Sequence, residues 1–113
     1  MKVSTKHLGQ RQTPRISAMD FFAAGGLHPA ASGLYSIIIN WLKQGMDALE
    51  LWVDRGDGKG FVFLAIDSIP DYTDTAAMPP AGQSALWKYK GIYIQADQRV
   101  GQWSDVVSIP VAG

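Results

Sequence analysis

Apolar and polar residues alternate along several short segments of this chain, at the period of two that is typical of β-strands. Residues 35–42, YSIIINWL, place two isoleucines and Trp41 on one face, and three consecutive isoleucines favour extended backbone over helix. Residues 48–54, ALELWVD, place Leu, Leu and Val on one face and Glu, Trp and Asp on the other. This alternation predicts a strand that is buried on one side.

Segments rich in glycine, aspartate and proline separate the predicted strands. The stretch RGDGKG joins residues 48–54 to FVFLAI at 61–66, which predicts a β-hairpin. Further strands are predicted around Ile69 and Tyr72, over residues 87–96 (WKYKGIYIQA) and over residues 103–111 (WSDVVSIPV). Six or seven short strands without a convincing helix predict an all-β chain, folded as a two-sheet antiparallel β-sandwich.

The first 26 residues carry a different pattern. Residues 1–15 are polar and basic without an apolar segment, so we expect a flexible arm and no secretory signal peptide. Residues 16–24, ISAMDFFAA, are short and apolar, and they suit a first strand, a single helical turn or a cover over exposed tryptophans. We therefore assign the sandwich to residues 16–113, with its clearest pattern at 27–111.

From about Leu27 to Val111 the sequence resembles the fibronectin type III family. Trp41 in IIINW is similar to the core tryptophan of that family, and LELWVDRGDGKGF resembles its C strand and C–C′ hairpin. IYIQADQRVGQWSDVVSIPV resembles the F–G hairpin. Tyr89 is similar to the strand-F tyrosine, which can hydrogen-bond to upstream backbone. The resemblance implies an immunoglobulin-like sandwich with Trp41 and Tyr89 in its core.

The strand predicted at residues 87–96 has a conflict between its two faces. Tyr89, Gly91 and Tyr93 share one face, whereas Ile92 and Ile94 lie on the other and make it the better core face. A β-bulge at Gly91 would let Tyr89 and Ile92 both point inward. We therefore predict a bulge at Gly91 and, with it, an outward-facing Tyr93.

Composition and charge narrow the function classes. The formal net charge is zero, so we expect no nucleic-acid partner. The chain has no cysteine, which excludes thiolate catalysis and cysteine-based metal sites. No apolar run approaches the roughly 20 residues that span a bilayer, so no membrane partner is expected. The location stays open between the cytoplasm, a larger particle and an excerpt of an extracellular protein.

Residues with catalytic or metal-binding chemistry form no recognisable pattern. His7 and His28 each stand alone. The RGDGKG stretch lacks the glutamate that ends a calcium loop, because Ala65 occupies that position. Residues 55–57 spell the integrin-binding tripeptide Arg-Gly-Asp, but glycine and aspartate are expected in a turn in any case. We therefore expect no catalytic residue, no metal site and no cofactor, and we interpret the tripeptide as a coincidence.

Tryptophan and tyrosine side chains are the best candidates for a binding surface. Trp52 is expected to face outward, because its strand neighbours Leu49, Leu51 and Val53 form the inner face. With it, Trp87, Tyr93 and Trp103 are expected to form an aromatic patch on the sheet of strands C, F and G. Such rings bury much area at low entropy cost in an interface, although cross-strand aromatic pairs also stabilise a sheet on their own.

Three hypotheses for the function follow. The first is a non-catalytic binding or spacer module that contacts another protein, within a larger assembly or a multidomain protein. The alternative is a carbohydrate-binding module that uses the surface tryptophans. The third, an enzyme or metal protein, is the least favoured because no polar constellation supports it. The identity of the partner and the oligomeric state stay open.

Overall fold

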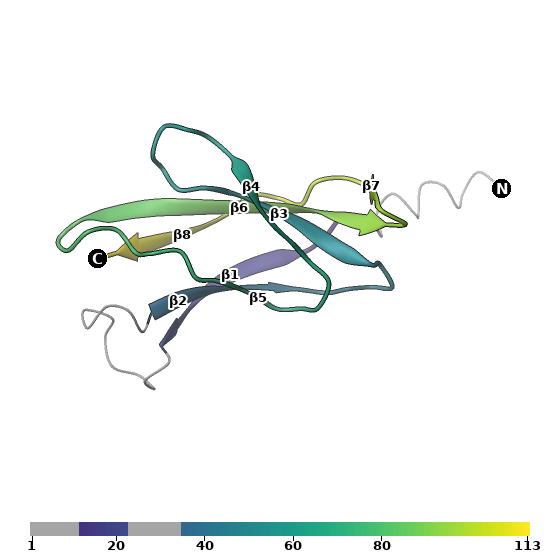
Figure 1. The fold of residues 1–113 in the computed structure, drawn as a ribbon, viewed down its shortest axis with the longest axis horizontal. Coiled ribbons are helices and arrows are strands. Elements are labelled where there is room, and N and C mark those ends of the chain that lie inside the picture. Colours follow the sequence, from purple (N-terminus) through teal and green to yellow (C-terminus); the bar gives the residue numbers. More distant parts are fainter. Residues whose placement is uncertain (1–11, 23–34) are drawn as a thin grey trace.

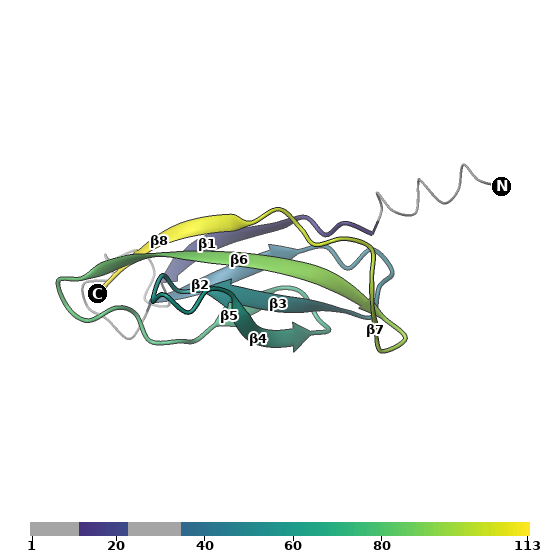
Figure 2. The ribbon, with the colours of Figure 1, turned by 90° about the horizontal axis from the view of Figure 1, so that it is seen from above.

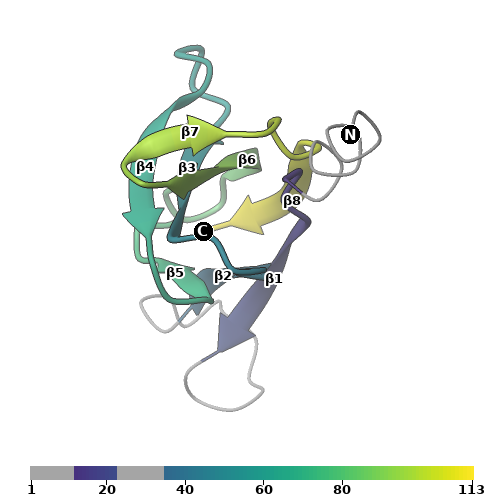
Figure 3. The ribbon, with the colours of Figure 1, turned by 90° about the vertical axis from the view of Figure 1, so that its right-hand side faces the viewer.

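A computed structural model describes residues 12–22 and 35–113, and side chains are described for residues 12–20 and 36–113. The described residues form eight strands and no helix, arranged as two antiparallel sheets. Figure 3 shows the two sheets as stacked layers. The fold is therefore an all-β sandwich of immunoglobulin-like architecture, as the sequence predicts. Nowhere in this part of the chain is there a helix long and apolar enough to cross a membrane.

The two sheets differ in size (Figures 1 and 2). The smaller sheet has the strand order β1-β2-β5, built from β1 (Ile16–Phe22), β2 (Tyr35–Trp41) and β5 (Tyr72–Asp74). The larger sheet has the order β4-β3-β6-β7, with β8 also paired to β6. Its strands are β3 (Ala48–Asp54), β4 (Val62–Asp67), β6 (Ser84–Gln95), β7 (Gln98–Val100) and β8 (Val107–Ala112).

The segment 16–24 forms a first strand over its described part. β1 pairs with β2 in a regular register from Ile16↔Trp41 to Phe22↔Tyr35. The two other predictions for this segment, a helical turn and a cover over the tryptophans, are therefore wrong. β1 is a strand of the smaller sheet, whereas Trp52 and Trp103 lie on the larger one. The end of the predicted arm also contacts the domain, since the Gln102 N–H donates to the Gln12 carbonyl at 3.4 Å. His7, His28 and residues 1–11 lie outside the described residues.

The chain turns back after β6 earlier than predicted, because the returning strand begins at Gln98 and not at Trp103. Ala96 and Asp97 both have positive φ, at 53° and 64°, as a two-residue type I′ turn requires. The chain returns at once as β7, and β8 begins only at Val107. Trp103 is therefore in the connection between β7 and β8 and not in a strand.

The predicted bulge at Gly91 is wrong. The register of β3 and β6 runs without a break from Ala48↔Ile94 through Leu51↔Gly91 to Asp54↔Lys88. The strand pairing is interrupted on the other edge of β6 instead. There β8 pairs with the first half of β6 and β7 pairs with its end. Between them, Ser104 bonds both backbone groups of Gly91: its N–H donates at 2.8 Å and its Oγ accepts at 3.0 Å. β6 therefore stays regular, and Tyr89, Gly91 and Tyr93 all lie on its buried face.

Glycine at position 91 is explained by Leu49. A Cβ added at Gly91 would lie 3.0–3.2 Å from three side-chain atoms of Leu49, which is closer than ordinary contact. We expect Gly91→Ala to lower the free energy of unfolding by about 1–3 kcal/mol through overpacking, measured by denaturant unfolding. Combining it with Leu49→Ala should give a loss smaller than the sum of the two single losses by at least about 0.5 kcal/mol. Additive losses would contradict this explanation.

The core lies between the inner faces of the two sheets. The buried cluster consists of Ile37, Ile39, Trp41, Leu49, Leu51, Val53, Trp87, Tyr89, Tyr93, Ile109 and Val111. The polar ends of its aromatic residues have hydrogen-bond partners: the Trp41 Nε1–H donates to Asp67 at 2.8 Å, and the Tyr93 hydroxyl donates to the Leu42 carbonyl at 2.6 Å.

The hydrogen bond of Tyr89 differs from the expectation. Its hydroxyl donates to the Asp74 carboxylate at 2.5 Å and not to upstream backbone. Burial, and then the bond to Asp74, raise the pKa of Tyr89 far above its usual value, so the hydroxyl keeps its proton. Tyr93 makes the predicted kind of bond to upstream backbone instead.

Candidate functional site

Aromatic and cationic side chains gather on the outer face of the larger sheet. Trp52 in β3 pairs with Phe63 in β4 on one side and with Lys90 in β6 on the other. We use the name aromatic–cation face for the group formed by Trp52, Phe61, Phe63, Lys90, Arg99 and Trp103. These residues come from four strands, β3, β4, β6 and β7, and from the connections before β4 and before β8.

A bulge in β4 determines which of its side chains face outward. The register of β3 and β4 shifts between Leu51↔Ala65 and Trp52↔Phe63, which leaves Leu64 as an extra residue in β4. Phe63 then pairs with Trp52, and Ile66 pairs with Glu50, although they are three positions apart. Both side chains therefore lie on the outer face, which a regular strand would not allow.

The rings of this face contact each other edge to face. The Trp52 ring lies 6.2 Å from that of Phe63 and 6.3 Å from that of Trp103, with interplanar angles of 81° and 88°. This T-shaped geometry is a favoured arrangement of aromatic pairs. Trp52 and Trp103 are both partly exposed, so the two tryptophans do come together at the surface.

Two cations lie over these rings. The Lys90 Nζ is 4.6 Å from the ring centroids of both Phe61 and Trp103. The Arg99 guanidinium carbon is 5.3 Å from the Trp103 centroid and 6.0 Å from that of Trp52. These distances are within the range of cation–π attraction, which holds each charge in place on the sheet.

Glu50 connects these groups from beneath. Its buried carboxylate accepts hydrogen bonds from Arg99, at 2.6 and 3.2 Å, and from the Trp52 indole at 2.7 Å. The Arg99 hydrogen bond lowers the pKa of Glu50, and the smaller opposing effect of burial does not cancel it. One carboxylate therefore orients both the arginine and the tryptophan.

The lowered pKa predicts how stability depends on pH. Because the folded-state pKa of Glu50 is below its usual 4.5, its contribution is complete above pH 4.5 and is lost as the pH falls through the folded-state pKa. The stability difference between the chain and Glu50→Gln should therefore be constant above about pH 5.5 and shrink at acid pH. Glu50 is the only glutamate of the chain, so its carboxyl ¹³C resonance reports the pKa directly. Arg99→Met should move that titration to higher pH, and an unchanged midpoint would contradict the assignment.

Exposed apolar side chains of β4 extend this face toward the edge of the sheet. Half of the eight large hydrophobic side chains exposed in the described part of the chain belong to residues 62–69. They are Val62, Phe63, Ile66 and Ile69, between 43% and 72% exposed. Phe63 and Ile66 belong to the outer face, whereas Val62 pairs with the inward-facing Val53. An exposed apolar edge next to an aromatic cluster is the composition of a contact surface.

Two members of the predicted patch lie elsewhere. Trp87 and Tyr93 are 3% and 1% exposed and belong to the core, because β6 has no bulge to turn Tyr93 outward. Trp52 and Trp103 are on the outer face as expected. Phe61 and Phe63 are not among the residues predicted for the patch. Strict alternation over FVFLAI would place Phe63 and Ile66 on opposite faces, and it does not reveal the bulge that brings both to the outer face.

Arg55 is bound within the structure. Its guanidinium donates to both carboxylate oxygens of Asp74, at 2.9 and 3.1 Å, and lies 4.3 Å over the Trp87 ring. Burial opposes its charge, but the bond and attraction to Asp74 prevail and raise the pKa of Arg55. The arginine of the Arg-Gly-Asp tripeptide therefore has a structural partner within the sandwich.

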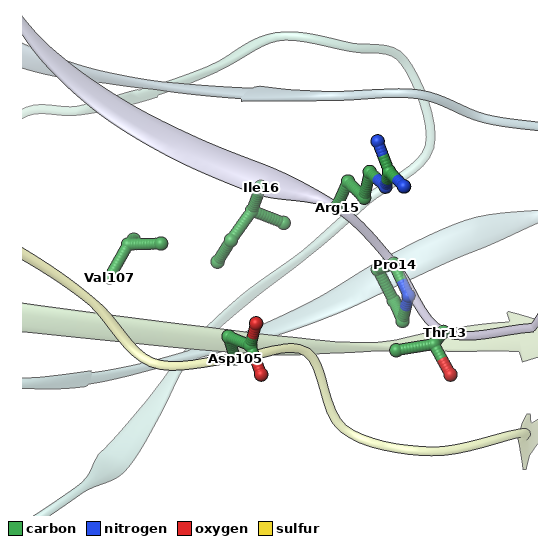
Figure 4. A pocket seen from close by; sticks show the side chains of 6 residues that line it. All are labelled: Thr13, Pro14, Arg15, Ile16, Asp105 and Val107. Carbon is green, nitrogen blue, oxygen red and sulfur yellow. The ribbon is translucent and has the colours of Figure 1, made fainter.

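One cavity lies where the start of β1 meets the connection before β8. It has a volume of about 590 Å³ and is lined by Thr13, Pro14, Arg15, Ile16, Asp105 and Val107. Ile16 and Val107 point into it, whereas the Arg15 guanidinium is directed away from the Asp105 carboxylate (Figure 4). A second cavity of about 280 Å³ lies beside Asn40 and Asp71, which bond each other at 2.9 Å. Arg15 lines both cavities, with Asp105 in the first and Asp71 in the second, and neither combination is among the ion pairs of the described residues.

Among the described residues no group of three or more His, Asp or Glu side chains could hold a metal ion. Comparison of the chain with models of known families, with curated protein sequences and with solved structures found no match. The geometry of the aromatic–cation face is therefore the observation that bears on function.

Proposed function

We propose that the chain is a non-catalytic interaction module of the fibronectin type III kind. Its contact surface is the aromatic–cation face, and its partner is another protein, within a larger assembly or a multidomain chain. The observation that carries this proposal is the joint exposure of Trp52 and Trp103 beside the apolar side chains of β4.

The strand order supports the fibronectin type III assignment. The β1-β2-β5 sheet and the β4-β3-β6 sheet continued by β7 and β8 correspond to strands A-B-E and C′-C-F-G of that family. Two of the segments that resemble the family are residues 49–61, which cover most of β3 and the connection after it, and residues 92–111, which run from the end of β6 into β8. Both lie in the sheet that carries the proposed contact surface.

The contrast between the two outer faces supports the choice of surface. On the smaller sheet, the outward positions include Ser17, Asn40 and Thr73, with Met19 and Ile38 as one apolar cross-strand pair. On the larger sheet, aromatic rings, cations and exposed aliphatic side chains are adjacent. Protein contact surfaces are enriched in Trp, Phe and Arg, which favours the larger sheet.

A carbohydrate-binding module is the weaker alternative. Sugar rings stack on the flat, open face of an aromatic ring. Here the Trp52 and Trp103 rings stand edge to face, and Arg99 lies over both while Lys90 covers Trp103. A sugar would have to displace these cations, whereas a protein partner can contact rings and cations together.

A photo-reactive amino acid placed at Ile66 tests the proposal in cells of the native source. Ile66 is 57% exposed on the proposed surface, and Met19, at 48% on the smaller sheet, provides a matched control position. We expect a defined covalent adduct with another protein from position 66 and none from position 19. Adding Trp52→Ala to the position-66 variant should abolish the adduct while leaving the thermal unfolding cooperative.

Adducts from position 19 with none from position 66 would assign the contact to the other sheet. Adducts that persist in the Trp52→Ala variant would show that the aromatic cluster is not what binds. Either result would contradict the proposed surface.

A further inference from the structure

Three lysine and arginine side chains face outward from β6 and β7: Lys88, Lys90 and Arg99. Arg99 is paired with Glu50 at 2.6 Å. In the described part of the chain the ion pairs are this one and Arg55–Asp74, so no carboxylate there lies within ion-pair distance of Lys88 or Lys90. Asp54, the cross-strand neighbour of Lys88, accepts the Gly56 N–H instead. The surface therefore carries positive charge that its own acids do not neutralise.

Lys90 is held in position by the rings around it. Its Nζ lies 4.6 Å from both the Phe61 and the Trp103 centroid, and the side chain is partly buried. A cation that is already oriented loses little conformational entropy when it binds. An incoming carboxylate would meet a fixed donor whose hydration is reduced by two aromatic rings, which favours a charge-assisted hydrogen bond.

Apolar side chains lie at a defined separation from this cation. Neighbouring strands in a sheet are about 4.8 Å apart, so β4 and β6, on either side of β3, lie about 10 Å apart. Phe63 and Ile66 of β4 are 53% and 57% exposed. A partner that covers both features must present a carboxylate about 10 Å from an apolar group.

On these grounds we propose that the aromatic–cation face binds an acidic segment of another protein. Its carboxylates contact Lys90, and its apolar side chains cover Phe63 and Ile66. This inference rests on the proposed function and adds the chemistry of the partner. Charge complementarity separates this occupant from two others. A second copy of the chain would bring its own unpaired lysines against these, and residues 1–15 are themselves basic.

The test is an NMR titration of the full ¹⁵N-labelled chain with capped octapeptides that repeat Glu-Ser-Val-Ser. An extended backbone places Glu and Val on one face of such a peptide. Matched peptides carry Lys or Gln in place of Glu. The four tryptophan indole N–H signals report the site, because Trp52 and Trp103 are on the proposed surface and Trp41 and Trp87 are buried internal references.

We expect the Glu peptide to shift the Trp52 and Trp103 signals saturably and to leave the other two unchanged. Its Kd should be at least about tenfold lower than that of the Gln peptide, with no saturable response to the Lys peptide. The affinity should fall as salt rises from about 0.02 M to 0.5 M. Lys90→Met should weaken binding at least about fivefold, while Arg15→Met, which removes an exposed cation on β1's approach, should not change it.

Three results would overturn the inference. They are equal affinities for the Glu and Lys peptides, a Lys90→Met variant that binds as well as the parent chain, and no shift up to about 5 mM peptide. Concentration-dependent shifts of Trp52 and Trp103 without peptide would assign the face to a second copy and overturn it as well. A larger saturable response to cellohexaose than to the Glu peptide would do the same in favour of sugar. Photo-crosslinking from Ile66 does not depend on the partner's charge. If it succeeds while the titration fails, the proposed contact surface stands and only the acidic nature of the partner is rejected.

Discussion

Replacing Asp74 with alanine is expected to lower the free energy of unfolding by about 3–5 kcal/mol. Asp74 is 1% exposed and accepts four hydrogen bonds: two from Arg55, one from Tyr89 and one from the Ala76 N–H. Its removal leaves a partly buried guanidinium and a buried hydroxyl without their partner. Denaturant unfolding of the parent chain and the variant measures the loss.

Two comparisons make this prediction specific. Asp105→Ala removes an exposed carboxylate and should change the stability by no more than about 0.5 kcal/mol. Replacing the whole network, with Arg55→Met, Asp74→Leu and Tyr89→Phe together, should restore more than half of the loss. The guanidinium and the hydroxyl are then removed with their partner, and only the partly buried Ala76 N–H loses its acceptor. A loss below about 1 kcal/mol in Asp74→Ala, or a triple variant no more stable than it, would contradict the role of the network.

Trp87→Ala is expected to lower the free energy of unfolding by about 3–5 kcal/mol, whereas Trp103→Ala should lower it by about 1 kcal/mol. The two residues look alike in the sequence, since each stands at the start of a predicted strand, at 87–96 and 103–111. Trp87 is 3% exposed and packs in the core beneath Arg55, whereas Trp103 is partly exposed over the outer face. Chemical or thermal unfolding of both variants measures the difference.

The cavity left by Trp87 explains the large effect, because the surrounding core can collapse only in part. Trp103 leaves no enclosed cavity, and its loss removes contacts with Trp52, Lys90 and Arg99. Similar losses in the two variants, or the larger loss in Trp103→Ala, would contradict their assignment to core and surface.

The sandwich could be predicted because each of its main strands carries its own pattern. β2 and β3 begin and end within a residue of the segments read from alternation alone. The extra residue in β4 and the two-residue turn at Ala96-Asp97 could not be predicted. Both depend on how neighbouring strands pair, and alternation within one strand does not record that.

The candidate site could be predicted only in part for the same reason. The outward position of Trp52 could be predicted, because its neighbours Leu49, Leu51 and Val53 on β3 clearly form the inner face. Tyr93 was misplaced because Ile92 and Ile94 look more apolar than Tyr89 and Gly91. The structure has Gly91 inside because Leu49 fills the space that a side chain would need, and Tyr93 inside because its hydroxyl reaches the Leu42 carbonyl. Neither contact leaves a local signal in the sequence.

Polar groups in this fold serve mainly to fix positions. Asp74 joins the β3–β4 connection to β5 and β6, and so connects the two sheets. Glu50 joins β3 to β7 and orients Trp52. Between them, these two carboxylates hold both the core and the outer face in a defined geometry, which leaves Lys90 and the exposed side chains of β4 available for a partner.

Hydroxyl-radical footprinting of the chain, free and in extracts of its native source, tests most directly whether the aromatic–cation face is the contact surface. We predict that Trp52, Phe63 and Trp103 lose reactivity in the extract while Met19, which is 48% exposed on the other sheet, keeps it. Protection of Met19 with unchanged reactivity at Trp52 and Trp103 would contradict the assignment of this face as the contact surface.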